Sequence, residues 1–182
     1  MWTHTLLQKE KLSMNEVYIV RHGAAAELDN EIVQEGYRYL TIHGRNLCKI
    51  VALRLKDMKI RFDVIISSPI VRAVQTAEVF ASVLKYDGEI KTAIELIGGN
   101  TFHRFTKMLK RYSHHKNIGI FGHAPDVNHF STGLIKGQDI KNLHINFKNA
   151  SVCKINYDTD IERGRLEWFL NSENMKLTEV ES

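Results

Sequence analysis

Short apolar runs alternate with longer amphipathic segments along this chain, and that alternation constrains its fold more than any other feature. The runs are rich in Val, Ile and Phe, are typical of buried strands, and cover residues 17–20, 64–66 and 117–121, with a shorter strand in 89–96. Helical spacing of apolar residues predicts helices over about 41–58, 69–84, 101–112 and 125–134. Strands separated by helices predict a single three-layer α/β/α domain, a mainly parallel sheet with helices on both faces.

The two ends of the chain depart from this alternation. Residues 151–158 and 164–171 alternate apolar and polar side chains and flank a short acidic loop, so they predict a β-hairpin at an edge of the sheet. Residues 1–13 are predicted to be a loose N-terminal extension, and Met14 offers an alternative start. The domain itself is expected to cover residues 14–182.

Composition excludes several classes of protein. A chain of 182 residues with 43% apolar residues is long enough for one domain with a substantial core. Its net charge of +4 is far below that of a dedicated nucleic-acid binder. No apolar run approaches the roughly 18 residues that span a membrane, and the N-terminus lacks a secretory signal. We therefore expect a cytoplasmic protein without a nucleic-acid or membrane partner.

Cysteine and histidine spacing does not predict a metal site. Cys48 and Cys153 form no ligand motif and no disulfide framework, and are expected to be buried thiols in a reducing compartment. His103, His114 and His115 lack a carboxylate partner and a regular ligand spacing. No metal and no cofactor are predicted.

Polar residues that can bind a phosphoryl group follow three of the predicted strands. They are Arg21, His22, Ser67, Ser68, Arg72 and His123. Because the carboxyl ends of parallel strands meet at one edge of a sheet, we expect these side chains to lie together. Guanidinium groups bind phosphoryl oxygens in bidentate fashion, and helix N-termini supply free N–H groups. A neutral histidine among them is also a nucleophile near pH 7, which predicts covalent phosphoryl transfer as well as binding.

Three motifs at these positions resemble the histidine phosphatase superfamily: "RHG" at His22, "SSPIVRAVQTA" around Arg72 and "GHAP" at His123. The resemblance covers about residues 17–134. It implies that His22 is the phosphorylated nucleophile, held by a backbone contact through its other ring nitrogen, and that Arg21, Arg72 and His123 form the phosphate pocket. The segment "RYLTIHG", residues 38–44, also resembles SixA-type phosphohistidine phosphatases.

The sequence departs from the mutase-like branch of that superfamily. Ala24, Ala25 and Ala26 follow the glycine where that branch has acidic or hydroxyl residues, and residues 100–117 leave no room for a large capping insertion. Glu95 falls near the position of that branch's glutamate acid, without its sequence context. An open mouth favours a phosphoryl group carried by a protein. A weak or absent acid suits P–N cleavage, because imidazole departs readily, although Glu95 or Asp126 could serve as the acid.

Several of these residues also have ordinary structural interpretations. Ser67 and Ser68 are expected mainly to cap a helix, with Ser68 as a candidate phosphate contact, and Asp126 is favoured at a helix N-terminus by the macrodipole. A basic stripe on the helix of residues 101–112 is either a solvated face or a docking surface for an acidic phosphoprotein. The stripe consists of Arg104, Lys107, Lys110 and Arg111.

The sequence therefore predicts a metal-independent phosphatase with a phosphohistidine intermediate on His22, acting on phosphohistidine in a protein. One alternative is a broad-specificity phosphomonoesterase that acts on small phosphate esters and uses Glu95 as its acid. The other is an inactive module that binds phosphate or a phosphoprotein.

Overall fold

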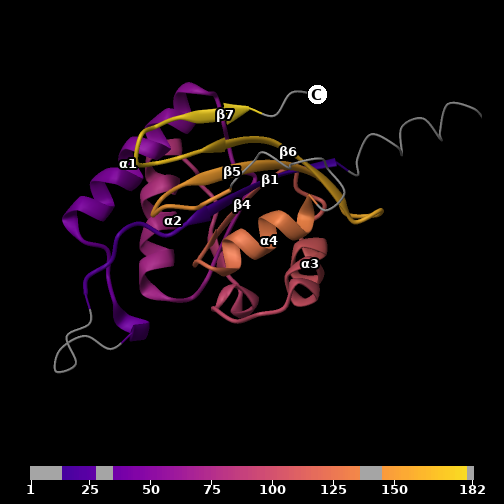
Figure 1. The fold of residues 1–182 in the computed structure, drawn as a ribbon, viewed down its shortest axis with the longest axis horizontal. Helices are drawn as coiled ribbons and strands as arrows, with labels where there is room; N and C mark the ends of the chain where they lie inside the picture. The colour runs from indigo at the N-terminus through magenta and orange to yellow at the C-terminus, as the bar shows by residue number, and fades with distance from the viewer. Residues whose placement is uncertain (1–13, 28–34, 136–144, 180–182) are drawn as a thin grey trace, which may run out of the picture.

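The computed structural model describes residues 14–27, 35–135 and 145–179, which form a sheet with the strand order β3-β2-β4-β1-β5-β6-β7 (Figure 1). The strands are β1 (Met14–Arg21), β2 (Val64–Ser67), β3 (Ile90–Thr92), β4 (Asn117–Gly122), β5 (Val152–Asp158), β6 (Arg163–Leu170) and β7 (Leu177–Glu179). The first four strands pair in parallel, and β5, β6 and β7 extend the sheet in antiparallel fashion beyond β1.

Helices cover both faces of this sheet. They are α1 (Ile42–Asp57), α2 (Val71–Leu84), α3 (Phe102–Arg111) and α4 (Asp126–Leu134), with short 3-10 helices η1 (Glu35–Tyr37) and η2 (Ile94–Leu96). Figure 1 shows α1 and α2 on one side of the sheet and α3 and α4 on the other. The predicted three-layer fold is confirmed.

Strand β1 shows why the sequence requires two helical layers. Val17 and Ile19 belong to the core cluster that contains α3 and α4, whereas Tyr18 and Val20 belong to the cluster that contains α1 and α2. All four side chains are at most 1% exposed. A strand that is apolar on both faces is stable only where both faces are covered.

The start of α2 differs from the prediction. The helix begins at Val71, and its N-cap residue is Ile70, so the serines before Pro69 do not cap it. The Ser68 hydroxyl accepts a hydrogen bond from the Ile70 N–H at 3.3 Å within the connecting turn. Ser68 is therefore left at the carboxyl edge of the sheet, next to the end of β2.

Two further predictions need correction: that Asn100 caps the helix of residues 101–112, and that the C-terminal hairpin lies at the edge of the sheet. The N-cap of α3 is Thr101, whose hydroxyl accepts from the Arg104 N–H at 3.3 Å, whereas the Asn100 amide donates to loop carbonyls. The hairpin of β5 and β6 is followed by β7, so β6 is not the last strand. The sequence of β7 is too short and too polar to have predicted a strand.

Residues 1–13, predicted to be an extension, lie outside the described residues. None of the helices in the described ranges is long and apolar enough to cross a membrane.

Candidate active site

The end of β1 places His22 at the carboxyl edge of the sheet, beside the end of β4. The His22 N–H donates to the Gly122 carbonyl at 3.0 Å, which continues the parallel pairing by one residue. The His22 carbonyl accepts from the Ala150 N–H at 3.2 Å and from the Asn149 amide at 3.1 Å. The backbone that carries this histidine is therefore held by the end of β4 on one side and by the turn that precedes β5 on the other.

The His22 ring has a defined tautomer. Its Nδ1 lies 2.7 Å from the Gly23 carbonyl oxygen, which can only accept, so Nδ1 carries the hydrogen. Arg72 Nε donates to the other ring nitrogen, Nε2, at 3.3 Å. The backbone contact that the family resemblance implied is present, and it leaves the Nε2 lone pair directed at the Arg72 guanidinium.

The environment keeps this ring uncharged. Burial lowers the pKa of His22 to about 3; the hydrogen bond to Gly23 opposes that change, and the charges of His123, Arg72 and Arg21 add to it. At neutral pH the ring is therefore a neutral imidazole, the form that acts as a nucleophile.

Arg72 lies in the first turn of α2, and its guanidinium forms an ion pair with the Glu35 carboxylate. Its Nη2 contacts Glu35 Oε1 at 2.8 Å, and its Nη1 donates to the Glu35 carbonyl at 2.9 Å. Glu35 also binds Arg38 at 3.1 Å, and these contacts with Arg38 and Arg72 lower its pKa although burial opposes them. Glu35 thus occupies both terminal nitrogens of the Arg72 guanidinium. Sequence reasoning missed it because it lies in an aperiodic polar segment.

His123 faces the same cluster from the end of β4. Its ring centroid lies 5.1 Å from that of His22, and its Nε2 is 2.8 Å from the Ser68 hydroxyl. Its Nδ1 is buried and has no partner among the described residues. Burial, and then the charge of Arg72, lower the pKa of His123 to about 4, so this ring is also neutral at pH 7.

Arg21 brings a second guanidinium to the cluster. Its Nη1 donates to the Phe147 carbonyl at 2.6 Å, and its Nε is buried with no partner among the described residues. Burial lowers its pKa without removing the charge at neutral pH. A buried donor without an acceptor is costly, and a bound anion would satisfy it.

The loop after His22 is fixed by close approach to the first turn of α1. Thr41 caps α1 by accepting from the Gly44 N–H at 2.9 Å, and its own N–H donates to the Ala24 carbonyl at 3.0 Å. A Cβ built on Gly44 would lie 2.1 Å from the Ala24 oxygen. A side chain at this position would therefore push the helix and the loop apart.

Thr76, on α2, connects two of the motifs. Its hydroxyl accepts from the Gly23 N–H at 3.0 Å and donates to the Arg72 carbonyl at 2.7 Å. The side chain is buried, so both bonds are protected from water.

The two candidate acids, Glu95 and Asp126, interact with residues other than His22. Glu95, in η2, binds Arg111 at 2.9 Å; burial raises its pKa, but its backbone N–H and Arg111 outweigh that effect and the pKa is lowered. Asp126 is buried at the start of α4 and accepts from the Gly99 N–H at 2.9 Å. No hydrogen bond or ion pair between described residues links either carboxylate to His22.

The remaining residues that the sequence singled out lie outside the contacts of His22. Ser67 is buried and donates to the Ser68 carbonyl at 2.9 Å, and Cys48 and Cys153 are buried free thiols. Arg104, Lys107 and Arg111 are exposed along α3. Within the described ranges, no group of three or more His, Cys, Asp or Glu residues could hold a metal ion.

Comparisons with known proteins find similarity to histidine phosphatases. The family model described as "Histidine phosphatase superfamily (branch 1)" matches residues 17–97. The Escherichia coli (strain K12) protein named phosphohistidine phosphatase SixA is 24% identical over 167 residues, which cover 91% of this chain and 99% of that protein. An uncharacterized protein of Picosynechococcus sp. (strain ATCC 27264 / PCC 7002 / PR-6) is 30% identical over 143 residues, 75% of this chain and 82% of the relative. A solved structure of the protein histidine phosphatase SixA complexed with tungstate has a TM-score of 0.79 at 24% identity, covering 88% of this chain and 99% of that one.

Proposed function

Because this chain is a phosphatase that belongs to the histidine phosphatase superfamily, we propose that it acts through a phosphorylated His22 and that its substrate is phosphohistidine in a protein. The observation that carries the proposal is the His22 ring, which is neutral, bound through Nδ1 to the Gly23 carbonyl, and directed through Nε2 at Arg72. A neutral nitrogen next to a guanidinium can attack phosphorus while the cation binds the phosphoryl oxygens.

In the first step, His22 Nε2 attacks the phosphorus and forms an N–P bond. The bond between phosphorus and the substrate imidazole breaks, and its electron pair stays on that imidazole nitrogen, which takes a proton from solvent. Arg21, Arg72 and His123 surround the phosphoryl oxygens in this proposal. The free Arg21 Nε and the donors that Glu35 now occupies on Arg72 are the groups that would bind them.

In the second step, water attacks the phosphorus and the N–P bond of His22 breaks. The electron pair returns to Nε2, the attacking water keeps one of its protons as part of the departing hydrogen phosphate, and its other proton passes to solvent. No metal ion and no cofactor takes part in the proposed sequence.

The positions of the carboxylates support phosphohistidine as the substrate. A serine or threonine ester leaves as an alkoxide and gains about 10²–10⁴ in rate from a positioned acid, whereas imidazole is protonated readily by solvent. Glu95 and Asp126 are engaged elsewhere, and the arginines lower the pKa of Glu35. The E. coli relative, whose name states phosphohistidine phosphatase activity, supports the same substrate class.

A broad-specificity phosphomonoesterase is the second candidate, and one observation favours it. Glu35 is a carboxylate in direct contact with Arg72, so it could take the part of the acid that the sequence assigned to Glu95. Under either function, docking of an acidic phosphoprotein on Arg104, Lys107 and Arg111 and a cytoplasmic location stay predictions.

The test is phosphate release from a phosphohistidine-bearing protein beside release from a phosphoserine peptide. We expect fast release from phosphohistidine only, and a loss of at least about 10⁴-fold in the variant His22→Ala. His43→Ala, an exposed histidine on α1, is the matched control and should keep full activity.

Three other results would change the proposal. Equal release from both substrates would favour the phosphomonoesterase. Tight binding of the phosphorylated protein without turnover would favour a binding module. Full activity of His22→Ala would exclude His22 as the nucleophile.

A further inference from the structure

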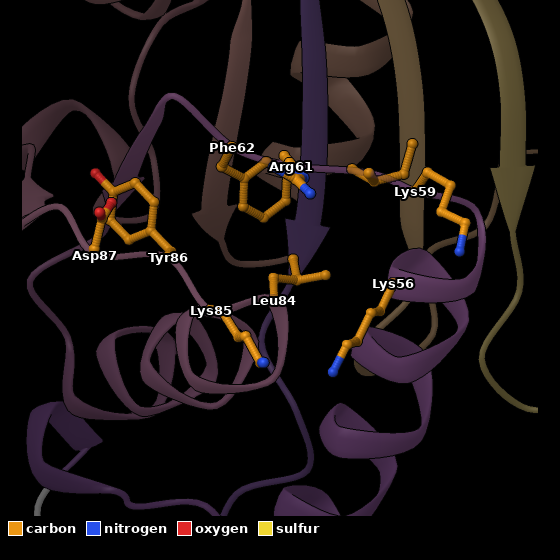
Figure 2. A pocket seen from close by; sticks show the side chains of 9 residues that line it. Lys56, Lys59, Arg61, Phe62, Leu84, Lys85, Tyr86 and Asp87 are labelled. Carbon is orange, nitrogen blue, oxygen red and sulfur yellow. The ribbon is translucent and has the colours of Figure 1, made fainter.

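A cavity of about 540 Å³ lies between the ends of α1 and α2 (Figure 2). Its lining consists of Lys56, Lys59, Ile60, Arg61, Phe62, Leu84, Lys85, Tyr86 and Asp87. These residues lie at the end of α1, just before β2 and at the end of α2. The cavity is therefore at the amino edge of the parallel strands, whereas the His22 cluster is at their carboxyl edge.

The wall of the cavity is strongly basic. Lys56, Lys59, Arg61 and Lys85 are exposed, and none of their side chains has a hydrogen bond or ion pair with another described residue. Asp87 is the single acid among the lining residues and pairs with none of them. Figure 2 shows the side chains of Lys56, in α1, and Lys85, just after α2, extending toward the same side of Leu84. Four cations thus line one concavity with one acid among them.

The ordinary role of such residues explains only part of this arrangement. Lysines near a helix C-terminus interact favourably with the helix dipole, and this accounts for Lys56 and Lys85. It does not account for Arg61, which lies beyond the end of α1, or for the concave shape of the wall.

The floor of the cavity is apolar and fixed. Phe62 is 7% exposed and packs edge-on against Tyr18, with ring centroids 5.4 Å apart. The Tyr86 hydroxyl donates to the Glu89 carbonyl at 3.2 Å, which holds this ring in position. Leu84 completes a surface against which a flat apolar group can pack.

We propose that this cavity binds a small organic polyanion of the nucleotide class, with its phosphates on the basic wall and its flat apolar part on Phe62, Leu84 and Tyr86. Unpaired lysines and an arginine are suited to phosphate oxygens. The volume lies within the roughly 300–1,000 Å³ of typical small-ligand sites. An acidic peptide would use the wall and leave the floor unfilled, so the small molecule is the better fit.

The test is calorimetric titration of the full chain with ATP, adenosine and tripolyphosphate. We expect ATP to bind with a Kd below about 1 mM, and adenosine and tripolyphosphate each to bind at least about tenfold more weakly. The variants Lys56→Glu and Lys85→Glu should each weaken ATP binding by at least about tenfold.

Two control variants check that ATP binds in this cavity and not elsewhere on the chain. Lys110→Glu makes the same charge change in the last turn of α3, so it should leave the ATP affinity within about twofold. Arg72→Ala disables the proposed phosphate site at the opposite edge and should also leave ATP binding intact.

Four results would overturn the proposal. These are no binding of ATP, loss of ATP binding in Arg72→Ala, an equal loss in Lys110→Glu, and tripolyphosphate binding as tightly as ATP. Preferential binding of a poly-glutamate peptide would instead assign the wall to an acidic protein partner. Because Lys56→Glu and Lys85→Glu change only the amino edge and Arg72→Ala changes only the carboxyl edge, failure here is distinguishable from failure of the proposed phosphatase function.

Discussion

The two edges of the sheet carry two basic regions that are built in opposite ways. At the carboxyl edge, Arg21 and Arg72 are largely buried, and each is bound through at least one nitrogen to a fixed oxygen. At the amino edge, Lys56 and Lys85 are exposed and make no side-chain hydrogen bond with another described residue. Catalysis needs charges that are in place before the transition state forms, whereas binding of a ground-state ligand tolerates charges that move to meet it.

The topology produces this difference. Arg21 and Arg72 each donate to a main-chain carbonyl, so the guanidinium groups at the carboxyl edge are held by the backbone. Lys56 and Lys85, at the amino edge, lie at helix C-termini without such a bond to another described residue, and ordering their long side chains costs entropy.

The largest effect expected from this comparison is in the variant Arg72→Ala. Removing one fixed donor to a developing charge should lower kcat/KM for phosphohistidine by about 10²–10³. Arg72→Lys should recover little of it, because an ammonium lacks the planar fork. Lys56→Ala, measured in the same assay, should stay within about twofold of the wild type. A large loss in Lys56→Ala would show that the two edges are not separate.

An effect of intermediate size is expected when the pH is lowered, on the folding stability that depends on His123. Burial lowers the pKa of His123 to about 4 from the ordinary 6.5, so between these values the unfolded chain binds a proton that the folded chain does not. Folding stability from this group is therefore present above about pH 6.5 and lost as the pH falls toward 4, by about 1.4 kcal/mol per pH unit. Denaturant unfolding should show the stability difference between wild type and His123→Gln shrinking across that window.

The control for this measurement is Lys56→Gln at the amino edge, whose stability difference from the wild type should stay constant over the same pH range. A constant difference for His123→Gln would mean that the ring titrates normally in the folded chain.

The smallest effect is expected from Glu35→Gln. An exposed ion pair contributes about 0.2–1 kcal/mol, so freeing Arg72 from this carboxylate should tighten inhibition by inorganic phosphate about two- to fivefold. Glu89→Gln, which removes the exposed pair with Lys91, is the matched control. A loss of turnover of about 10² or more in Glu35→Gln would instead identify Glu35 as a general acid and favour ester substrates.

The fold and the cluster of site residues could be predicted because both follow from local patterns. Strand runs that end in Arg21, Ser68 and His123 require only parallel pairing to bring these residues together, and the alternation with helices predicts that pairing. The backbone contact of His22 followed from the family resemblance, and the structure contains it. Their catalytic roles stay proposals until the His22 and Arg72 variants are measured.

The remaining features depend on contacts that no local pattern encodes. Glu35 reaches Arg72 across 37 positions of sequence, from a segment with neither helical nor strand periodicity. The Ser68 hydroxyl contacts His123 and does not cap α2, whose N-cap residue is Ile70. The cavity at the amino edge exists only where the ends of two helices converge on Phe62.

The Thr76 hydroxyl has a consequence for motion within the site. It joins the backbone after His22 to the backbone that carries Arg72, so a displacement of one is transmitted to the other. Thermal fluctuations of the two motifs should therefore be correlated, and the distance between His22 Nε2 and the Arg72 guanidinium should vary less than the position of either group. A single buried oxygen atom would in this way keep the relative geometry of the two side chains constant while the surrounding loops move.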